Sequence, residues 1–542
     1  MKLLTGLDAA FLYLETPEMP MHVGALQVFE RPRGDRTRFV KRLREHMAER
    51  LPLAPQLRRR LWWPPLKVSN PAWVDAEPDL DWHITSVTLP PEAKDGDGMA
   101  VLEAEIGRLH PERLDRERPL WRMWVLEGLA PSAEGLPRVA LYTQFHHAAV
   151  DGKAAVALGQ ALLDPAPSGR ELALRPSSRA KVYSLGGAQM LRGAVAAEAG
   201  QIAQITRQIP ETVGALAQAL GAAWKLRRSA KEAKPGEPAP SNIGAAPRTR
   251  FNANVGTERA FATLSLPLPA LKAAGKQLGA TINDVVLWLC ATALRDYLGA
   301  HGGLPKKSLV AAMPFSLGQG KGSANDVSMS AVSLGTHLAD PAKRLAHIKA
   351  ATAAMKATLG SLKSVLPTDF PSMGVPWLLP GLARLYTSAR VAERLPAMAN
   401  VVISNVPGPP VPLFLAGARL TANYPTSIVV HGVALNITLQ SYAGQLDFGF
   451  IADPVHAPDL RALAAGVGKA FEQLQAMAQA ASAPPAQARP TAAATRKKVA
   501  PTAAPTPKPK AAPKAKTSPK AASKAAPKAA APRKTPSRKT AA

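Results

Sequence analysis

Two features of the sequence predict a two-lobed α/β protein. Apolar runs with the alternation of β-strands are mixed with segments of helical periodicity, and this mixture occurs twice, in residues 1–180 and in residues 250–480. With 542 residues, the chain is long enough to bury a large core. Two α/β halves indicate an enzyme whose active site lies in the cleft between the lobes, where ligand sites are common.

The first half is expected to form an amino-terminal lobe. Residues 21–30 and 138–145 have the alternating, β-branched and aromatic composition of strands. Residues 35–51 and 97–110 repeat apolar side chains every three or four positions, which predicts helices that each turn one face to a core.

The second half, residues 250–480, repeats the pattern as a carboxy-terminal lobe. A strand at residues 258–268 precedes a helix that begins at Pro267 and another from Thr281 to Leu298. Four further strands are expected, at residues 308–317, 399–408, 428–442 and 445–453.

Residues 181–249 are expected to bridge the two halves. Apolar residues at three- and four-residue steps between Ile202 and Leu220 predict an amphipathic helix, and a basic, proline-rich linker follows it. Such a helix could lie on a membrane, although packing against a core is the commoner use of an amphipathic helix.

Residues 481–542 form a tail rich in Lys, Ala and Pro. The tail has 15 Lys and Arg residues and no Asp or Glu, so only +13 of the net charge of +28 lies on the rest of the chain. Without aromatic residues the tail cannot bury enough surface to offset the entropy of ordering, and we expect it to be disordered. It could contact DNA or anionic lipid, or act only as a solubilising segment.

The chain shows no export signal and no membrane span. Asp8 interrupts the apolar run at the amino terminus, and the longest uncharged apolar segments fall well short of the roughly 20 residues that cross a bilayer. The single cysteine, Cys290, lies in an apolar helical segment and cannot form an intrachain disulfide. A cytoplasmic protein is therefore expected.

The stretch YTQFHHAAVDG, residues 142–152, holds the most informative pattern. A strand-like run ends at Phe145, and small residues follow, as at a strand–turn–helix junction. Strand alternation sends His146 and His147 to opposite faces, one to the core and the other to a cleft. Diverging histidines are poorly placed to share a metal, and the chain has no HExxH pattern, so no metal site is predicted. A histidine general base fits better, because imidazole accepts and returns protons near neutral pH.

The same stretch matches the HHxxxDG motif of the CoA-dependent acyltransferase superfamily, which includes the chloramphenicol acetyltransferase fold. Together with five further ordered blocks, it resembles the bacterial wax ester synthase/diacylglycerol acyltransferase family. The further blocks are the opening LTGLDAAFLYLETPEMPMHVGAL, PLW at residues 119–121, ND at residues 283–284, NVPGP at residues 405–409 and the late GVALNITLQSYAGQLDFGF. A PVS-like block is replaced by PFSLG at residues 314–318, and the basic tail lies outside the shared core.

The resemblance implies a chloramphenicol acetyltransferase-like fold with an active-site tunnel between the lobes. It implies transfer of a long-chain acyl group from acyl-CoA to diacylglycerol, to a long-chain fatty alcohol, or to both. His147 would be the general base, His146 would have a less certain orienting role, and Asp151 would support the motif structurally. Acyl-CoA is then a co-substrate, and no permanently bound cofactor is implied.

Three residues are candidates for substrate binding, each with a structural alternative. Gly152 would keep the turn open where a side chain would obstruct substrate. Asn283 could reach the site, but a helix cap formed by Asp284 explains the ND pair without catalysis. Trp121 fits a tunnel wall and a core position equally well.

Other functions stay open on the sequence alone. The acyltransferase body could be a non-catalytic binding protein on a lipid droplet or membrane, although an intact motif argues against a retired site. An acyltransferase for another alcohol acceptor is also possible. Because the substrates are lipids, we expect peripheral association with the inner membrane face or with lipid droplets. The residues that hold CoA are unassigned, and the basic clusters Arg58–Arg60 and Lys225–Arg228 are candidates only by charge.

Overall fold

The computed structural model describes most of the chain between residues 2 and 482. The described ranges are 2–4, 6–35, 37–65, 70–150, 152–172, 189, 192–193, 246–316, 327–362, 394 and 396–482. One compact unit extends from Met1 to Pro484. The predicted bridge helix, Asp151 and residues 483–542 of the basic tail lie outside the described residues, whereas residues 481–482 end helix α12 (Leu460–Ser482).

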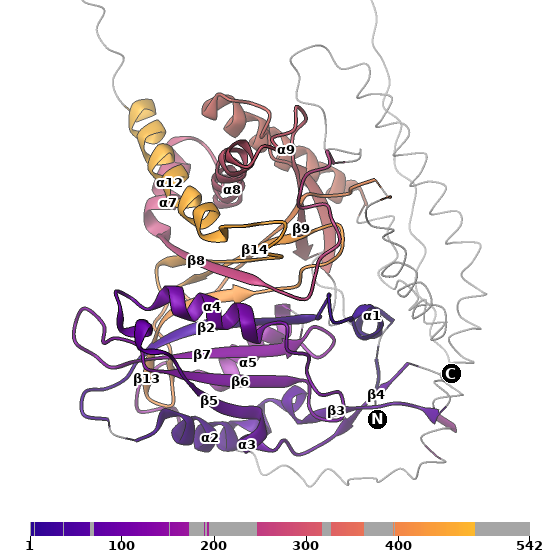
Figure 1. Cartoon of the computed structure of the whole chain (residues 1–542), viewed down its shortest axis with the longest axis vertical. Helices are drawn as coiled ribbons and strands as arrows, with labels where there is room; N and C mark the ends of the chain where they lie inside the picture. Colours follow the sequence, from indigo (N-terminus) through magenta and orange to yellow (C-terminus); the bar gives the residue numbers. More distant parts are fainter. Residues whose placement is uncertain are drawn as a thin grey trace, which may run out of the picture. The chain divides into compact units, whose positions relative to one another are not determined.

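The amino-terminal lobe is built on a six-stranded sheet (Figure 1). Its strand order is β12, β13, β2, β7, β6, β5, and within it only β5 and β6 pair in parallel. The strands are β2 (His22–Glu30), β5 (Ile84–Thr88), β6 (Trp121–Glu127), β7 (Arg138–His146), β12 (Phe414–Leu415) and β13 (Ala418–Thr426).

Helices cover both faces of this sheet. Phe39, Leu43 and Met47 recur at four-residue steps and are buried with Leu158 of the helix after β7 on one face. Leu102 and its neighbours on a third helix are buried on the other face. These helices are α2 (Phe39–Arg50), α5 (Gly152–Leu162) and α4 (Met99–Leu109).

Shorter elements complete the lobe. A three-stranded sheet has the order β1, β4, β3, and helix α1 follows β1 directly in the chain. These elements are β1 (Lys2–Leu3), α1 (Gly6–Leu14), β3 (Arg59–Trp62), β4 (Ala72–Asp75), α3 (Leu80–His83) and the 3₁₀ turns Leu51–Leu53, Pro55–Arg58 and Pro91–Lys94.

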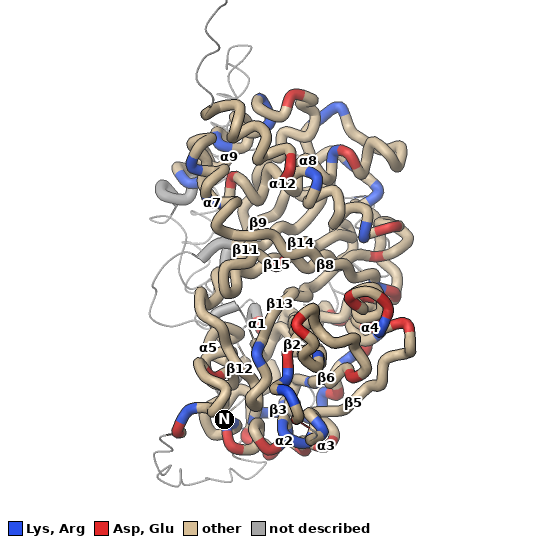
Figure 2. Tube along the Cα trace, turned by 90° about the vertical axis from the view of Figure 1, so that its left-hand side faces the viewer, with Lys and Arg blue, Asp and Glu red and all other residues tan. Residues whose placement is uncertain are grey.

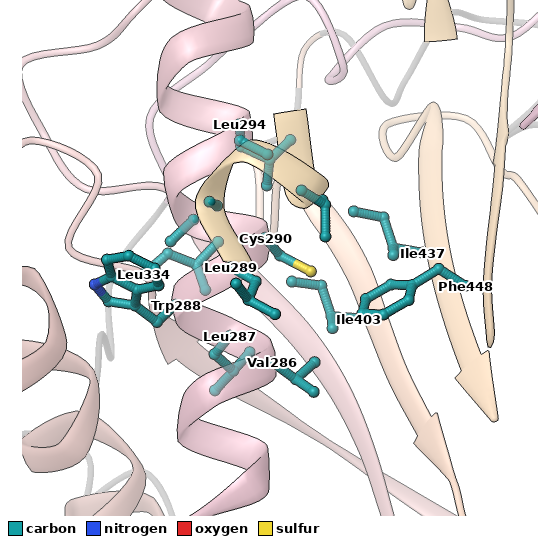
Figure 3. Close-up of a cluster of buried hydrophobic side chains, with 14 of the residues drawn as sticks. Val286, Leu287, Trp288, Leu289, Cys290, Leu294, Leu334, Ile403, Ile437 and Phe448 are labelled. Atoms are coloured by element: carbon teal, nitrogen blue, oxygen red, sulfur yellow. The ribbon is translucent and has the colours of Figure 1, made fainter. Parts of the chain in front are cut away.

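The carboxy-terminal lobe has a second six-stranded sheet, with the order β10, β9, β11, β14, β15, β8. Helices α7, α8, α9 and α12 pack on it around a large apolar core (Figure 3). The strands are β8 (Ala260–Pro267), β9 (Val310–Ser316), β10 (Val327–Ser333), β11 (Val401–Val406), β14 (Leu435–Tyr442) and β15 (Gln445–Ala452). The helices are α7 (Leu268–Gln277), α8 (Ile282–Ala300), α9 (Pro341–Leu362) and α12 (Leu460–Ser482).

Helix α8 runs through the centre of this core. Cys290 is fully buried among Leu289, Ile403 and Phe448, and burial raises the pKa of its thiol to about 12 (Figure 3). This confirms the prediction that the cysteine is a packed, unreactive side chain.

Strand β13 links the two halves of the chain. It comes from the second half of the chain, yet it pairs with β2 in the amino-terminal sheet, with Tyr424 opposite Leu26. A Cβ atom added at Gly449 of β15 would lie 1.8 Å from the carbonyl oxygen of Pro425 in β13, so the two sheets touch here backbone to backbone. The amino-terminal lobe is therefore not formed by residues 1–180 alone.

Within the described segments, no single helix is long and apolar enough to cross a membrane. The pair α7 and α8 meets that length and composition only when taken together, and the two helices are bent by 98°.

Charged residues lie mainly on helices and loops, and the strands of the carboxy-terminal sheet are almost free of them (Figure 2). Asp447 of β15 is the single charged residue in the six strands of that sheet. It is fully buried and accepts hydrogen bonds from Ser265 Oγ at 2.6 Å and from the Asn423 backbone N–H at 2.9 Å. Burial raises its pKa to about 6.

Asp447 makes the stability of the fold depend on pH. Its folded-state pKa lies above the unfolded value near 3.9, so the folded protein retains a proton that the unfolded chain releases between these values. The free energy of unfolding should therefore fall, by up to about 3 kcal/mol, as pH rises from about 4 through about 6. Urea unfolding of Asp447→Asn should lack this fall, because an amide does not ionise. An equal loss of stability in the variant at pH 4.5 and pH 8 would contradict the assignment.

Candidate active site

The predicted strand–turn–helix junction is present at the end of β7. The strand ends at His146, and α5 begins at Gly152. The carbonyl oxygen of His146 accepts hydrogen bonds from the backbone N–H groups of Ala149 at 2.8 Å and Val150 at 3.2 Å, which closes a tight turn. His147 therefore lies on a turn whose backbone is internally hydrogen-bonded.

The two histidines of the motif have different surroundings, and only His146 belongs to the strand. His146 is buried, with 1% of its surface exposed, whereas His147 is half-buried. The backbone N–H of His147 donates to the carbonyl oxygen of Met21 at 2.8 Å, just before β2. The His147 imidazole stacks on Phe11 of α1, with 4.1 Å between ring centroids and 15° between planes.

Hydrogen bonding fixes the tautomer of His146. Its Nδ1 accepts from the backbone N–H of Ala148 at 3.1 Å, so the proton of the neutral ring is on Nε2. That Nε2 lies 3.5 Å from Oε1 of Glu15, the residue that follows α1. Burial lowers the pKa of His146 and keeps the ring neutral near pH 7. The Nε2–H of neutral His146 thus faces a buried carboxylate.

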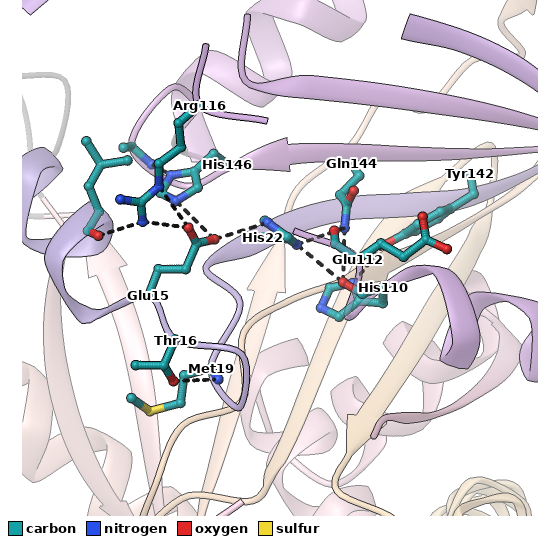
Figure 4. A network of polar contacts seen from close by, with 12 residues as sticks. Glu15, Thr16, Met19, His22, His110, Glu112, Arg116, Tyr142, Gln144 and His146 are labelled. Atoms are coloured by element: carbon teal, nitrogen blue, oxygen red, sulfur yellow. Dashed lines mark hydrogen bonds and ion pairs between the residues drawn. The ribbon is translucent and has the colours of Figure 1, made fainter. Parts of the chain in front are cut away.

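Glu15 is the centre of a buried polar network that sequence reasoning did not identify (Figure 4). Its Oε1 also lies 3.3 Å from Nε2 of His22, and its Oε2 accepts from Arg116 Nη2 at 2.6 Å. Burial alone would raise the pKa of Glu15, but its interactions with His146 and His22 outweigh burial and hold the pKa below its ordinary value. Glu15 is therefore ionised.

The network continues behind His22. Gln144 Nε2 lies 2.8 Å from His22 Nδ1, and the same Nδ1 lies 3.3 Å from the His110 carbonyl oxygen (Figure 4). The same amide nitrogen donates to the His110 carbonyl oxygen at 3.0 Å, and His110 Nδ1 lies 2.7 Å from the Tyr142 hydroxyl. Burial lowers the pKa of His110 far below its ordinary value, so this ring is also neutral.

A sequence signal for these residues existed. Glu15 directly follows an apolar helix, and His22 begins an apolar strand; both lie in the opening block, and Arg116 lies just before PLW. Ionisable residues next to buried segments are candidates for a paired or functional role.

The PLW block supports the histidine turn through its backbone. The carbonyl oxygen of Leu120 accepts from the His146 backbone N–H at 3.0 Å. Trp121 is fully buried, donates from Nε1 to the Leu57 carbonyl oxygen at 2.9 Å and stacks on His83 at 4.1 Å. Of the two alternatives for Trp121, these contacts support the core position.

The ND and NVPGP blocks lie side by side in the carboxy-terminal lobe. Exposed Asn283 accepts a hydrogen bond at Oδ1 from Asn405 Nδ2 at 2.8 Å. Asp284 closes a capping box with Thr281 at the start of α8 and accepts from Thr352 Oγ1 at 2.6 Å. The structural explanation of Asp284 is therefore confirmed, and Asn283 is the member of the pair with an exposed amide.

The remaining predicted residues have varied positions. Gly152 is the first residue of α5, and Asp151 lies outside the described residues. Arg58 forms an ion pair with Glu77 at 2.6 Å, and the Lys225–Arg228 cluster is outside the described ranges. Among the residues that the structure describes, no group of three or more His, Cys, Asp or Glu side chains is arranged to hold a metal ion.

Comparison with known proteins identifies the family. Residues 4–286 match the model of the wax ester synthase/diacylglycerol acyltransferase catalytic domain, and residues 323–475 match that of the WS/DGAT C-terminal domain. The chain belongs to this family. The WS/DGAT models cover both lobes, which confirms the resemblance seen in the ordered sequence blocks and makes the chain an acyltransferase of this class.

Individual WS/DGAT relatives agree. A Mycobacterium tuberculosis H37Rv protein that carries the name of a diacylglycerol O-acyltransferase is 35% identical over 477 residues, covering 87% of this chain and 99% of that protein. A second one, tgs2, is 33% identical over 484 residues, covering 88% and 99%. The solved wax ester synthase/diacylglycerol acyltransferase of Marinobacter aquaeolei VT8 is 28% identical with a TM-score of 0.61, covering 88% of this chain and 100% of that one. This structural match confirms the two-lobed α/β fold.

The two adjacent residues of the ND block should contribute unequally to the free energy of unfolding. Asp284→Ala removes the cap of α8 and the partner of Thr352, and it should lower the free energy of unfolding by about 1–3 kcal/mol. Asn283→Ala, at an exposed position, should change stability by less than about 0.5 kcal/mol. Chemical denaturation of both variants tests this, and equal stabilities would contradict the structural role of Asp284.

Proposed function

We propose that this chain moves a long-chain acyl group from acyl-CoA to the hydroxyl of diacylglycerol, of a long-chain fatty alcohol, or of both. The products are triacylglycerol and wax ester. One observation carries the proposal: within a WS/DGAT catalytic domain, the motif holds one histidine fixed by a buried carboxylate and presents the other, His147, half-exposed on a turn.

In this proposal, His147 is the general base. Its neutral imidazole accepts the hydroxyl proton while the alcohol oxygen attacks the thioester carbonyl carbon. The new C–O bond forms, the C–S bond breaks with its electron pair going to sulfur, and the imidazolium returns the proton to the departing CoA thiolate. The step needs no covalent acyl-enzyme, and it consumes one acyl-CoA and one alcohol to give one ester and one free CoA.

Rigid placement of His147 supports this role. Its backbone is bonded to Met21, and its ring packs against Phe11, so its orientation is set before substrate binds. A tunnel between the lobes, with Gly152 and Asn283 at its wall, would hold both substrates together and exclude water, the competing hydroxyl nucleophile. Trp121 would then contribute to packing next to the histidine turn and would not contact substrate.

The test is CoA release from palmitoyl-CoA by the purified full-length chain, with hexadecanol or a diacylglycerol as acceptor and with the extracted esters identified. His147→Ala should lower the acceptor-dependent rate by roughly 10²- to 10⁴-fold. A matched control is His301→Ala. His301 directly follows helix α8, is also half-buried, and stacks on Tyr297 with 4.2 Å between ring centroids. If the folded wild-type protein releases no CoA in response to an acceptor, the proposal is contradicted and a non-catalytic binding protein becomes the better interpretation.

We also propose that the basic tail, residues 481–542, binds anionic surfaces and so attaches the enzyme peripherally to the inner membrane face or to lipid droplets. Fifteen cationic side chains without an acidic one support counterion release from lipid or DNA phosphates, without sequence preference. The full chain should bind vesicles containing anionic phospholipid, and a chain ending at residue 482 should not.

Binding of the full chain should weaken steeply between 50 and 200 mM salt, as roughly expected for release of several counterions. Duplex DNA in the same titration distinguishes a general polyanion contact from a lipid contact. Equal binding by the full and shortened chains would leave the tail as a solubilising segment.

A further inference from the structure

We propose that Glu15 is the positioning residue of the general base: its single buried carboxylate fixes the backbone on both sides of His147 and the aromatic ring stacked on it. This inference rests on the proposed role of His147. Glu15 acts on the base through three neighbouring elements.

The first connection runs through β7. Glu15 Oε1 faces Nε2 of His146, and Nδ1 of the same ring accepts the backbone N–H of Ala148. The His146 ring therefore joins the carboxylate to the residue after the base, while its own backbone precedes the base. Moving His146 would move both flanks of His147.

The second connection runs through β2. Glu15 Oε1 also faces Nε2 of His22, which lies directly opposite His146 in the β2–β7 pairing. The residue before His22 is Met21, whose carbonyl oxygen accepts the backbone N–H of His147. Oε1 of Glu15 therefore contacts the start of β2, through His22, and the end of β7, through His146. The backbone of His147 is connected to both strand ends.

The third connection runs through α1. Arg116 Nη2 donates both to Glu15 Oε2 at 2.6 Å and to the carbonyl oxygen of Leu12 at 2.7 Å. This fixes the carboxy-terminal turn of α1, and Phe11 on that turn stacks on His147. The carboxylate therefore also determines where the ring that covers the base lies.

The charges of the cluster balance. Glu15 is ionised, Arg116 from the segment before β6 is cationic, and His146 from β7 and His110 behind it are neutral. Nε2 of His22 from β2 lies 3.3 Å from Glu15 Oε1. The ion pair that holds both flanks of the base therefore has no net charge, and removal of either partner leaves one unbalanced charge beside His146, the residue before the base.

The decisive variants are Glu15→Gln and Arg116→Gln, which unbalance the ion pair in opposite directions. Glu15→Gln leaves a cation, which disfavours the imidazolium of His147, so the acid limb of kcat/KM should move down by roughly 0.5–1 pH unit. Arg116→Gln leaves an anion and should move the same limb up by a similar amount. In both variants kcat should fall by about 10- to 100-fold, with KM for palmitoyl-CoA within about threefold of wild type.

The matched control is Glu30→Gln. Glu30 is at the other end of β2, is exposed to the same 9% as Glu15, and also pairs with an arginine, Arg419 at 2.8 Å. The Glu30→Gln variant loses a comparable ion pair at a distance from the histidine turn along β2. The acid limb of its kcat/KM profile should therefore stay at the wild-type pH. If Glu15→Gln does not fold, the upward shift in Arg116→Gln, whose partly exposed side chain tolerates replacement, decides the question.

The outcomes separate this inference from the proposed function. Inactive wild type, or His147→Ala as active as wild type, would overturn the function whatever Glu15 does. Active wild type with an inactive His147→Ala, but with Glu15→Gln and Arg116→Gln behaving like Glu30→Gln and showing no opposite shifts, would overturn only the positioning role.

Discussion

One buried ionised carboxylate, that of Glu15, is the interaction on which the arrangement of the candidate site depends. A charge in the protein interior is strongly unfavourable unless it is paired and hydrogen-bonded. Its requirement for donors brings together Arg116, His22 and His146 from three separate elements. The two motif histidines therefore differ: His146 faces Glu15 through Nε2, and His147 is the histidine that we propose exchanges a proton with substrate.

The second constraint is the pairing of β13 with β2. Because a strand from the second half of the chain completes the first sheet, the two lobes share one apolar core, which contains Leu26 and Tyr142 together with Phe261 and Ile451. The close contact of Gly449 with Pro425 lets the two sheets approach without intervening side chains. The lobes are therefore not independent domains, and the histidine turn at the end of β7 belongs to a unit built from both halves.

Sequence patterns predicted the elements whose periodicity is local. The strands β2 and β7, the helix α8 and the cap formed by Asp284 all follow from spacing within one segment. Strand β13 was not predicted, because Pro425 and the polar residues before it are typical of a loop. The short strand β12 pairs only with the first residues of β13, so the end that contains Pro425 is an edge, where proline is tolerated. The Glu15 network was missed because Arg116, the cation that pairs with Glu15, is 101 residues away in sequence, a separation that no local pattern reports.

The account's central claim is that one motif histidine, His146, is held neutral against a buried carboxylate while the other, His147, exchanges a proton with substrate. The most direct measurement is an NMR titration of the ring-carbon signals of ¹³C-labelled histidine in the full chain from pH 8 to pH 5, assigned with His146→Gln and His147→Gln. The account predicts that the His146 signal has the position of the neutral Nε2–H tautomer near pH 7, and that His146 is protonated at a lower pH than His147. A His146 signal that titrates together with an unresponsive His147 would contradict it.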